Sequence, residues 1–402
     1  MNYPAVADRL KGMVPRDLTD RLKAAAKSFP AVTVTGPRQS GKSTLCRAVF
    51  PKHAYANLET PDVRSFALGD PRGFLAQYPH GAILDEVQRC PELPSYLQGL
   101  IDQDPAPGRW ILTGSQNLFL LESVSQSLAG RTGVLHLLPL ARSEVRRFDG
   151  CPADLDEAML AGGYPRIFDQ KVPPAEWLGS YVGTYLERDV RTITNVGDLV
   201  AFQRFVELCA GRSAQLLNLS GLASDAGVSQ PTAKAWLSVL ETSFIVFRLP
   251  PLHANIRKRL VKMPKLHFYD TGLVCWLLGI RSADQLRKHP LRGAIFETWV
   301  VSEIIKHRTN RGEHGGVFLY RDQHGTEGDF LIEHGSQYVL VEAKSGQTIS
   351  DDTLSAARRI KTAVEEAGPC RAVVAYGGQA RQARHDVLLL PWDQIDQEHW
   401  AR

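Results

Sequence analysis

The feature that most constrains this chain of 402 residues is the run GPRQSGKS at positions 36–43. The run fits the pattern GxxxxGK[ST], with the β-rich AVTVT before it and the helix-forming TLCRAVF after it, and a chance match would lack this context. A polyphosphate needs many backbone N–H donors at close range, and a helix N-terminus supplies donors together with a dipole that favours anions. The sequence therefore predicts a phosphate-binding loop between a strand and a helix.

The residue types of this loop suit ATP. Gly36 permits the turn, and Gly41 allows the backbone to approach the phosphates closely. Lys42 would reach the β- and γ-phosphates as a catalytic group, and the hydroxyl of Ser43 would ligate Mg²⁺. The full set expected to contact the nucleotide is Gly36, Pro37, Arg38, Gln39, Ser40, Gly41, Lys42, Ser43 and Thr44.

A pair of acids ends the apolar run AILDE at positions 82–86. Downstream of a phosphate-binding loop, Asp85 would bind Mg²⁺, directly or through water, and Glu86 would act as general base on the attacking water. Acids at a strand end also serve simply to cap the next helix. The pairing of the two acids after such a strand favours the catalytic interpretation.

Two further features suggest groups that respond to the nucleotide. The run WILTGSQN at 110–117 places Ser115 and Asn117 at the tip of another buried strand, where either could sense the γ-phosphate or simply form a turn or cap. Arg131 ends the run SLAGR. Presented by a neighbouring subunit it would be an arginine finger and would require a homo-oligomer; otherwise it is a solvated surface residue.

The first part of the chain alternates apolar runs with helical stretches. Such alternation predicts a parallel sheet that is covered by helices. The strands are expected at 31–35, 54–58, 81–85, 110–114 and 134–138, with a helix at 92–102.

The middle of the chain predicts a helix, a tight turn and a second helix at 222–243. Gly227 would supply the turn, Ser229 the N-cap and Pro231 the first helical turn. Strands expected at 244–249 and 265–269 flank a basic segment, which suggests a winged helix with a basic wing. DNA binding is favoured over a protein-interaction role because the wing is so basic, with Gln230, Thr232 and Lys234 on the available face. The basic residues are Arg257, Lys258, Arg259, Lys262 and Lys265.

The last part holds a second candidate site. Asp329 near the start of one strand and Glu342 near the end of the next could share Mg²⁺, with Glu297 on the preceding helix completing the acidic set. Lys344 would lie on the same strand face as Glu342 and could activate water. The order resembles the PD-(D/E)xK core of restriction endonucleases, with a helix at 351–367 and a strand at 371–376. No proline precedes the first acid, so cleavage activity stays open.

These patterns together predict an α/β protein of several domains, since the chain is too long for one core. The chain has no apolar run of membrane-spanning length and no secretory signal, and its six cysteines are scattered. These features predict a cytoplasmic protein. The domains are expected to be a P-loop ATPase at 1–150, a helical linker or lid at 151–195, a winged-helix-like domain at 196–284 and a restriction-endonuclease-like α/β domain at 285–402.

The chain also resembles a prokaryotic family of AAA+-type ATP-binding proteins whose C-terminal half is a domain of unknown function. The resemblance covers nearly the whole chain. It implies the architecture more than the biological role. It rests on GPRQSGKST, AILDEVQRCPEL, ILTGSQN, SLAGR, GGYP, YLERDV, KLHFYDTGL, FETWVVSEI, EGDFLI and VEAKSG.

The leading hypothesis is an ATPase, with ATP and Mg²⁺ as cofactors, that acts on DNA through the second half of the chain. One alternative is a switch protein that regulates a partner in its ATP-bound state and keeps the nuclease-like fold as a docking surface. Another is a metal-dependent nuclease that uses ATP only as a regulator.

Overall fold

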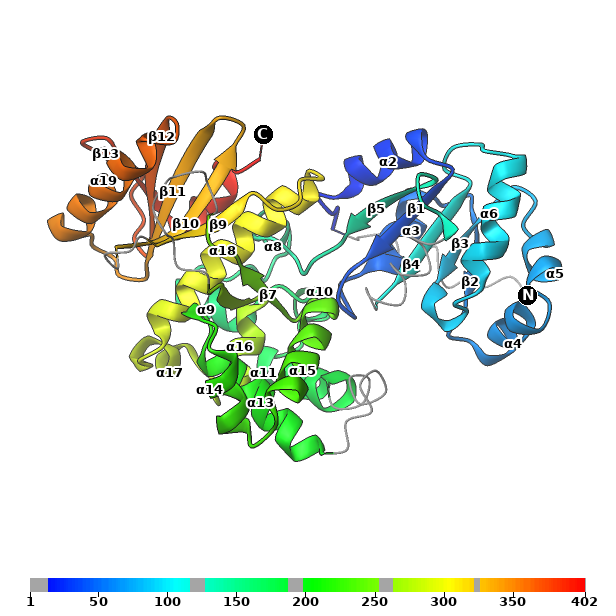
Figure 1. Cartoon of the computed structure of the whole chain (residues 1–402), viewed down its shortest axis with the longest axis horizontal. Coiled ribbons are helices and arrows are strands. Elements are labelled where there is room, and N and C mark those ends of the chain that lie inside the picture. The colour runs from blue at the N-terminus through cyan, green and yellow to red at the C-terminus, as the bar shows by residue number, and fades with distance from the viewer. Residues whose placement is uncertain (1–13, 116–126, 187–197, 253–262, 322–325, 402) are drawn as a thin grey trace. The chain divides into compact units, whose positions relative to one another are not determined.

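The computed structural model describes residues 14–115, 127–186, 198–252, 263–321 and 326–401, and the chain forms two compact units (Figure 1). The first unit consists of the chain up to Leu140 together with Thr309–Gly312. The second consists of Ala141–Arg308 and Glu313–Arg402. The first unit thus ends before the predicted boundary at residue 150, and the boundaries at 195 and 285 stay predictions.

The first unit is built on a parallel five-stranded sheet with the order β2-β3-β4-β1-β5. Because every pairing is parallel, the carboxyl ends of all its strands meet at one edge. The strands are β1 (Ala31–Thr35), β2 (Ala54–Asn57), β3 (Ala82–Asp85), β4 (Trp110–Gly114) and β5 (Thr132–His136). The helices are α2 (Thr19–Ser28), α3 (Lys42–Val49), α4 (Pro61–Gly69), α5 (Pro71–Ala76), α6 (Leu93–Gln103) and the 3₁₀ helix η1 (Val87–Arg89).

The central strands are buried along their whole length, as expected when helices cover both faces of a parallel sheet. Side chains of β1 and β4 that alternate along the strands belong to two separate apolar clusters. Ala31, Trp110 and Leu112 pack in a cluster with residues of α5 and α6, whereas Val32 and Ile111 pack in a cluster with residues of α2 and α3. The two cores hold the carboxyl edge of the sheet in a fixed position.

Two predicted strands differ from the structure by two residues at one or both ends, and the strands predicted at 54–58, 81–85, 265–269 and 371–376 each differ by one residue at one end. The strand expected at 134–138 lies at Thr132–His136, because Leu137 and Leu138 are buried without belonging to the sheet. The strand expected at 244–249 is β7 (Val246–Leu249), because Phe244 has a left-handed backbone with φ of 57° and lies between the preceding helix and the strand.

The second unit begins with short helices and continues with a helix pair and a small sheet. Gly227 ends the first helix of the pair with φ of 75°, and the Ser229 hydroxyl caps the second by accepting from the N–H of Thr232 at 3.2 Å, which confirms both predicted roles. The small antiparallel sheet has the order β6-β8-β7. The elements are α8 (Arg142–Val145), α9 (Leu155–Ala161), α10 (Pro165–Asp169), α11 (Pro174–Tyr181), the π-helix η2 (Val182–Leu186), α13 (Leu199–Gly211), β6 (Gln215–Leu216), α14 (Leu219–Ala226), α15 (Gln230–Thr242), β7, β8 (Lys265–Phe268), α16 (Thr271–Leu277) and α17 (Ala283–Lys288).

The C-terminal part is a mixed six-stranded sheet with the order β13-β14-β12-β11-β10-β9. Strands β9, β10 and β11 pair antiparallel, and α19 connects β11 to β12, which runs parallel to it. The edge strand β13 and the strand β14 were not predicted. Within the described ranges, no helix is long and apolar enough to cross a membrane. The elements are α18 (Arg292–Asn310), β9 (Val317–Arg321), β10 (Glu327–His334), β11 (Gln337–Lys344), α19 (Asp351–Glu365), β12 (Cys370–Tyr376), β13 (Gln382–Arg384), β14 (Val387–Pro391) and the 3₁₀ helix η3 (Trp392–Gln397).

Candidate functional site

The phosphate-binding loop follows β1 at the carboxyl edge of the parallel sheet and leads into α3. Gly36 has φ of 149°, and a Cβ there would collide with the carbonyl oxygen of Leu137. Gly41 has φ of 92° at the N-cap of α3, which favours glycine. The sequence pattern therefore folds into a strand, loop and helix, as predicted.

Lys42 points back into the loop that it follows. Its Nζ donates to the carbonyl oxygens of Gly36 at 3.0 Å and Pro37 at 2.8 Å. Burial lowers the pKa of Lys42 to about 8, although the nearby carboxylates of Glu86 and Asp85 act to raise it. An ammonium has three donors, and these two bonds hold it in the curve of the loop, at the position from which it can turn to an anionic ligand.

The carboxylate of Asp85 is the centre of a buried hydrogen-bond network. Its Oδ1 accepts from the hydroxyl of Ser43 at 2.9 Å and from the hydroxyl of Thr113, while its Oδ2 accepts from the phenol of Tyr55 at 2.6 Å. Burial and the charge of Asp85 raise the pKa of Tyr55, so the phenol stays a donor. The network brings the predicted pair Ser43 and Asp85 together, and these hard oxygen groups fit a magnesium ion.

Tyr55 and Thr113 were not identified from the sequence. Thr113 is a polar residue in the buried strand β4, a signal that could have marked it, because a buried hydroxyl requires a partner. Tyr55 lies on β2, and its role follows only from the neighbouring position of β3 in the sheet.

Glu86 follows β3 with a left-handed backbone, φ 58° and ψ 47°, which is uncommon for a residue other than glycine. Its Oε2 accepts from the hydroxyl of Ser115 at 3.1 Å and from the side-chain amide of Gln88. Ser115 is buried after β4, so two predicted site residues from separate strands are in contact. Asn117, the other predicted sensor, lies outside the described residues.

Arg16 is a residue of this site that sequence reasoning missed. Its guanidinium donates to the carbonyl oxygen of Ser40 in the loop at 2.6 Å and to that of Leu138 beyond β5 at 2.8 Å. It therefore fixes the loop to the chain that leaves the neighbouring strand. No local pattern marks Arg16, since its partners are distant in sequence.

Arg131 lies at the opposite edge of the sheet from the loop. It directly precedes β5, whose first residue pairs with the first residue of β1. Its Nε and Nη2 contact the Asp102 carboxylate at 2.6 and 3.0 Å. The structure thus does not bring Arg131 to the loop of its own chain, and its role toward a neighbouring subunit stays a prediction.

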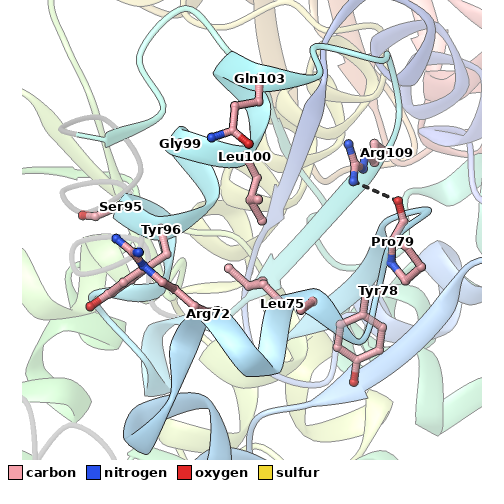
Figure 2. A pocket seen from close by; sticks show the side chains of 11 residues that line it. Arg72, Leu75, Tyr78, Pro79, Ser95, Tyr96, Gly99, Leu100, Gln103 and Arg109 are labelled. Atoms are coloured by element: carbon pink, nitrogen blue, oxygen red, sulfur yellow. Dashed lines mark hydrogen bonds between the residues drawn. The ribbon is translucent and has the colours of Figure 1, made fainter.

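A cavity of about 620 Å³ in the same unit is separate from the loop (Figure 2). Leu75 and Leu100 line it from α5 and α6. Arg109, just before β4, donates to the carbonyl oxygen of Pro79 at 2.8 Å. The loop residues do not line this cavity, so its size does not identify it as the nucleotide site.

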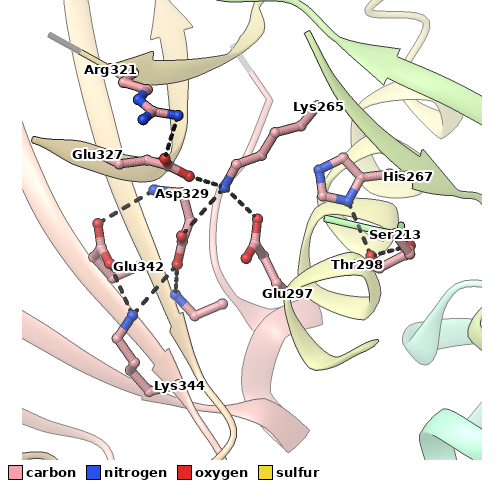
Figure 3. Close-up of polar contacts among 11 residues, drawn as sticks. Ser213, Lys265, His267, Glu297, Thr298, Arg321, Glu327, Asp329, Glu342 and Lys344 are labelled. Carbon is pink, nitrogen blue, oxygen red and sulfur yellow. Dashed lines mark hydrogen bonds and ion pairs between the residues drawn. The ribbon is translucent and has the colours of Figure 1, made fainter. Parts of the chain in front are cut away.

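The acids predicted in the C-terminal domain lie together around β10 and β11 (Figure 3). The backbone N–H of Asp329 donates to Oε1 of Glu342 at 3.4 Å, and Nζ of Lys344 donates to Oε2 of Glu342 at 3.2 Å. Lys344 and Glu342 thus share a strand face. Glu297 approaches from α18, and burial followed by the charge of Asp329 raises the pKa of both Glu297 and Glu342. A cavity of about 560 Å³ opens beside this cluster.

Lys265 is not part of a surface that faces DNA, contrary to the prediction for the basic segment. Its side chain is 3% exposed, and its Nζ lies 2.9 Å from Glu297 and 2.5 Å from Glu327. Ion pairs with these acids of the C-terminal domain stabilise the buried ammonium of Lys265. The other basic residues of that segment, Arg257, Lys258, Arg259 and Lys262, lie outside the described residues.

Three family models match successive parts of the chain. Residues 28–146 match the model of an AAA domain. Residues 152–284 and 292–395 match two domains of unknown function, DUF8612 and DUF4143. The match to the AAA domain and the loop geometry together make the first unit an AAA-type P-loop ATPase domain.

Two curated relatives extend the similarity to nearly the whole chain. Uncharacterised proteins of Mycobacterium tuberculosis and Mycobacterium bovis are each 31% identical over 384 residues, which cover 94% of this chain and 84% of the relative. The chain belongs to their family. This family of prokaryotic AAA-type P-loop proteins carries a C-terminal domain of unknown function, in agreement with the resemblance stated from the sequence.

Solved structures similar to this family member include two from other prokaryotes. A Walker-type ATPase of Pyrococcus abyssi is 14% identical with a TM-score of 0.45, and the match covers 66% of this chain and 96% of that chain. RuvB of Thermotoga maritima is 17% identical with a TM-score of 0.32, and the match covers 58% of this chain and 89% of that chain.

The lowered pKa of Lys42 predicts how nucleotide binding depends on pH. A phosphate is attracted by the protonated ammonium, so affinity for ATP should fall by about tenfold as the pH rises from one unit below to one unit above the value of about 8. Titration calorimetry at the two pH values measures this change. Lys42→Arg stays charged over this pH range. It should bind ATP more weakly than the wild type, and its affinity should vary little with pH. Equal affinity of the wild type at both pH values would contradict the account.

Proposed function

We propose that this protein hydrolyses ATP with Mg²⁺ and that it uses the hydrolysis in an action on DNA. The observation that carries the first part is the contact of the Ser43 hydroxyl with Asp85 at 2.9 Å, directly beside Glu86. In this proposal Ser43 and Asp85 form the metal-binding pair, and the neighbouring carboxylate of Glu86 accepts a proton.

Residues in and around the loop have separate parts in the proposed reaction. Backbone N–H groups of the loop and of the α3 N-terminus would bind the phosphates, and Lys42 would exchange its carbonyl partners for phosphate oxygens. Ser43 and Asp85 would hold Mg²⁺, which supplies charge neutralisation at the phosphates. Arg16 keeps the loop in shape through the Ser40 carbonyl.

Glu86 is the proposed general base. Bonds from Ser115 and Gln88 to its Oε2 orient the carboxylate, and the strained backbone fixes its direction. Ser115 lies after the strand next to that of the loop, and in this proposal it would report the state of the γ-phosphate to Glu86. Arg131 of a neighbouring subunit would act as an arginine finger in a homo-oligomer.

The proposal of DNA binding is supported by the order of elements in the middle of the chain. A helix, a short strand, the pair α14 and α15, and the antiparallel strands β7 and β8 follow one another as in a winged helix. Gln230 and Lys234 on α15 are exposed, and Thr232 is half-buried. This face is suited to contact phosphates and bases.

The C-terminal sheet supports a nuclease-like fold. Its order of α18, three antiparallel strands, α19 and a parallel strand agrees with a PD-(D/E)xK core. One observation favours the second candidate function, a switch in which this domain is a binding module without cleavage activity. The acids that would bind the metal ion for DNA cleavage already form ion pairs: Glu297 and Glu327 with Lys265, and Glu342 with Lys344.

Substituting the two catalytic residues should separate binding from hydrolysis. Glu86→Gln keeps the shape of the side chain but cannot accept a proton, so it should bind ATP and hydrolyse it on the order of a hundredfold more slowly. Lys42→Ala should lose nucleotide binding. A steady-state phosphate-release assay, combined with titration of ATP, measures both.

Glu92→Gln, at an exposed position on the same unit, is the matched control and should leave both properties unchanged. Hydrolysis at the wild-type rate by Glu86→Gln would remove Glu86 as the base.

DNA should raise the rate of ATP hydrolysis if the chain acts on it. Single- and double-stranded DNA are added to the wild type, to Lys234→Ala and to the control Lys288→Ala, whose lysine is exposed on α17. Lys234→Ala should require more DNA for half-maximal stimulation, by several-fold, because it loses a phosphate contact. Absence of stimulation by any form of DNA would refute this part and favour the switch.

A further inference from the structure

The buried ammonium of Lys265 lies among carboxylates that come from two elements of the C-terminal domain (Figure 3). Its Nζ is 2.9 Å from Oε1 of Glu297 on α18, 2.5 Å from Oε1 of Glu327 and 3.8 Å from Oδ1 of Asp329, both on β10. Three acids thus converge on one cation. Lys265 itself comes from β8, outside the C-terminal sheet.

A second contact fixes β8 against α18 and so keeps Lys265 in place. His267, two residues further along β8, is fully buried, and its Nδ1 lies 3.1 Å from the hydroxyl of Thr298, the neighbour of Glu297. The hydroxyl of Ser213 lies 2.8 Å from the same Thr298 oxygen. Residues two apart on a strand share a face, so Lys265 and His267 both face α18.

The second carboxylate oxygen atoms of Asp329 and Glu327 also have cationic or N–H partners. Oδ2 of Asp329 accepts from the backbone N–H of Ala343 at 2.9 Å and lies 3.8 Å from Nζ of Lys344. Oε2 of Glu327 lies 3.5 Å from Arg321. The negative charge that would attract a divalent cation is therefore balanced largely by side chains of the protein.

We propose that the ammonium of Lys265 takes the place of a divalent cation among Glu297, Glu327 and Asp329, so that the unaltered chain binds no divalent cation at this cluster. Mg²⁺ requires oxygen ligands at about 2.0–2.1 Å in a near-octahedral arrangement. A metal ion bound to Glu297 and Asp329 would lie close to Nζ of Lys265, and two cations in a partly buried site repel each other.

The distribution of metal-binding side chains agrees with this proposal. In the part of the chain that the structure describes, no group of three or more His, Cys, Asp or Glu residues is arranged to hold a metal ion. Glu297, Glu327 and Asp329, which resemble the acids of a nuclease site, instead form ion pairs between the C-terminal domain and Lys265 on β8. This ionic contact holds whether or not the chain acts on DNA.

The proposal predicts that removing one ammonium creates a metal site. Mn²⁺ alone, without nucleotide, is titrated by calorimetry into the full-length wild type, Asp329→Asn, Lys265→Met and the double variant. Wild type and Asp329→Asn should bind Mn²⁺ equally, since any binding in the other unit is common to both. Lys265→Met should bind one additional Mn²⁺, and Asp329→Asn in the same chain should abolish that gain.

The thermal unfolding midpoint gives a second measurement on the same proteins. Mn²⁺ should raise the midpoint of Lys265→Met, because a ligand that binds only the folded state stabilises it, and should shift the wild type and Asp329→Asn equally.

Two results would overturn the proposal: a Mn²⁺ site in the wild type that Asp329→Asn removes, or a folded Lys265→Met chain that gains no site. If Lys265→Met does not fold, Lys265→Gln is measured in its place. If neither variant folds, the comparison of the wild type with Asp329→Asn tests the proposal by itself, because unequal Mn²⁺ binding by these two proteins would contradict it.

Discussion

The carboxylate of Asp85 is the interaction on which the candidate site depends. It accepts hydrogen bonds from Ser43 at the start of α3, from Tyr55 on β2 and from Thr113 on β4. A buried carboxylate is costly unless its oxygens are satisfied, and here each bond also fixes a neighbouring element. The position of the loop hydroxyl, and through β3 the position of Glu86, follow from this network.

Features of the fold and the site were predictable from the sequence where residues close in the chain determine them. The loop at 36–43 and the turn at Gly227 were predictable because short-range backbone requirements determine the residue types, and the end of β3 at Asp85 followed from the apolar run before it. Tyr55 and Arg16 were not predictable, since their partners are brought to them only by the order of the strands and by the chain beyond β5. Strand ends such as that of β5 were misplaced because buried residues continue beyond the sheet.

Lys265 shows the limit of reasoning from charge along the chain. It belongs by sequence to a basic segment, and such segments usually face solvent or nucleic acid. In the structure its ammonium is buried among acids that follow it by dozens of positions in the chain, and only the packing of β8 against α18 reveals this. The same contact joins the middle of the chain to the C-terminal sheet within the second unit.

The central claim is that the Asp85 network forms a site for ATP hydrolysis. The most direct test is the rate of ATP hydrolysis by Asp85→Asn in the presence of Mg²⁺, with folding checked by circular dichroism. The amide can still accept from one hydroxyl but loses the charge that would hold Mg²⁺, so the rate should fall on the order of a hundredfold. A folded Asp85→Asn protein that hydrolyses ATP at the wild-type rate would contradict the account.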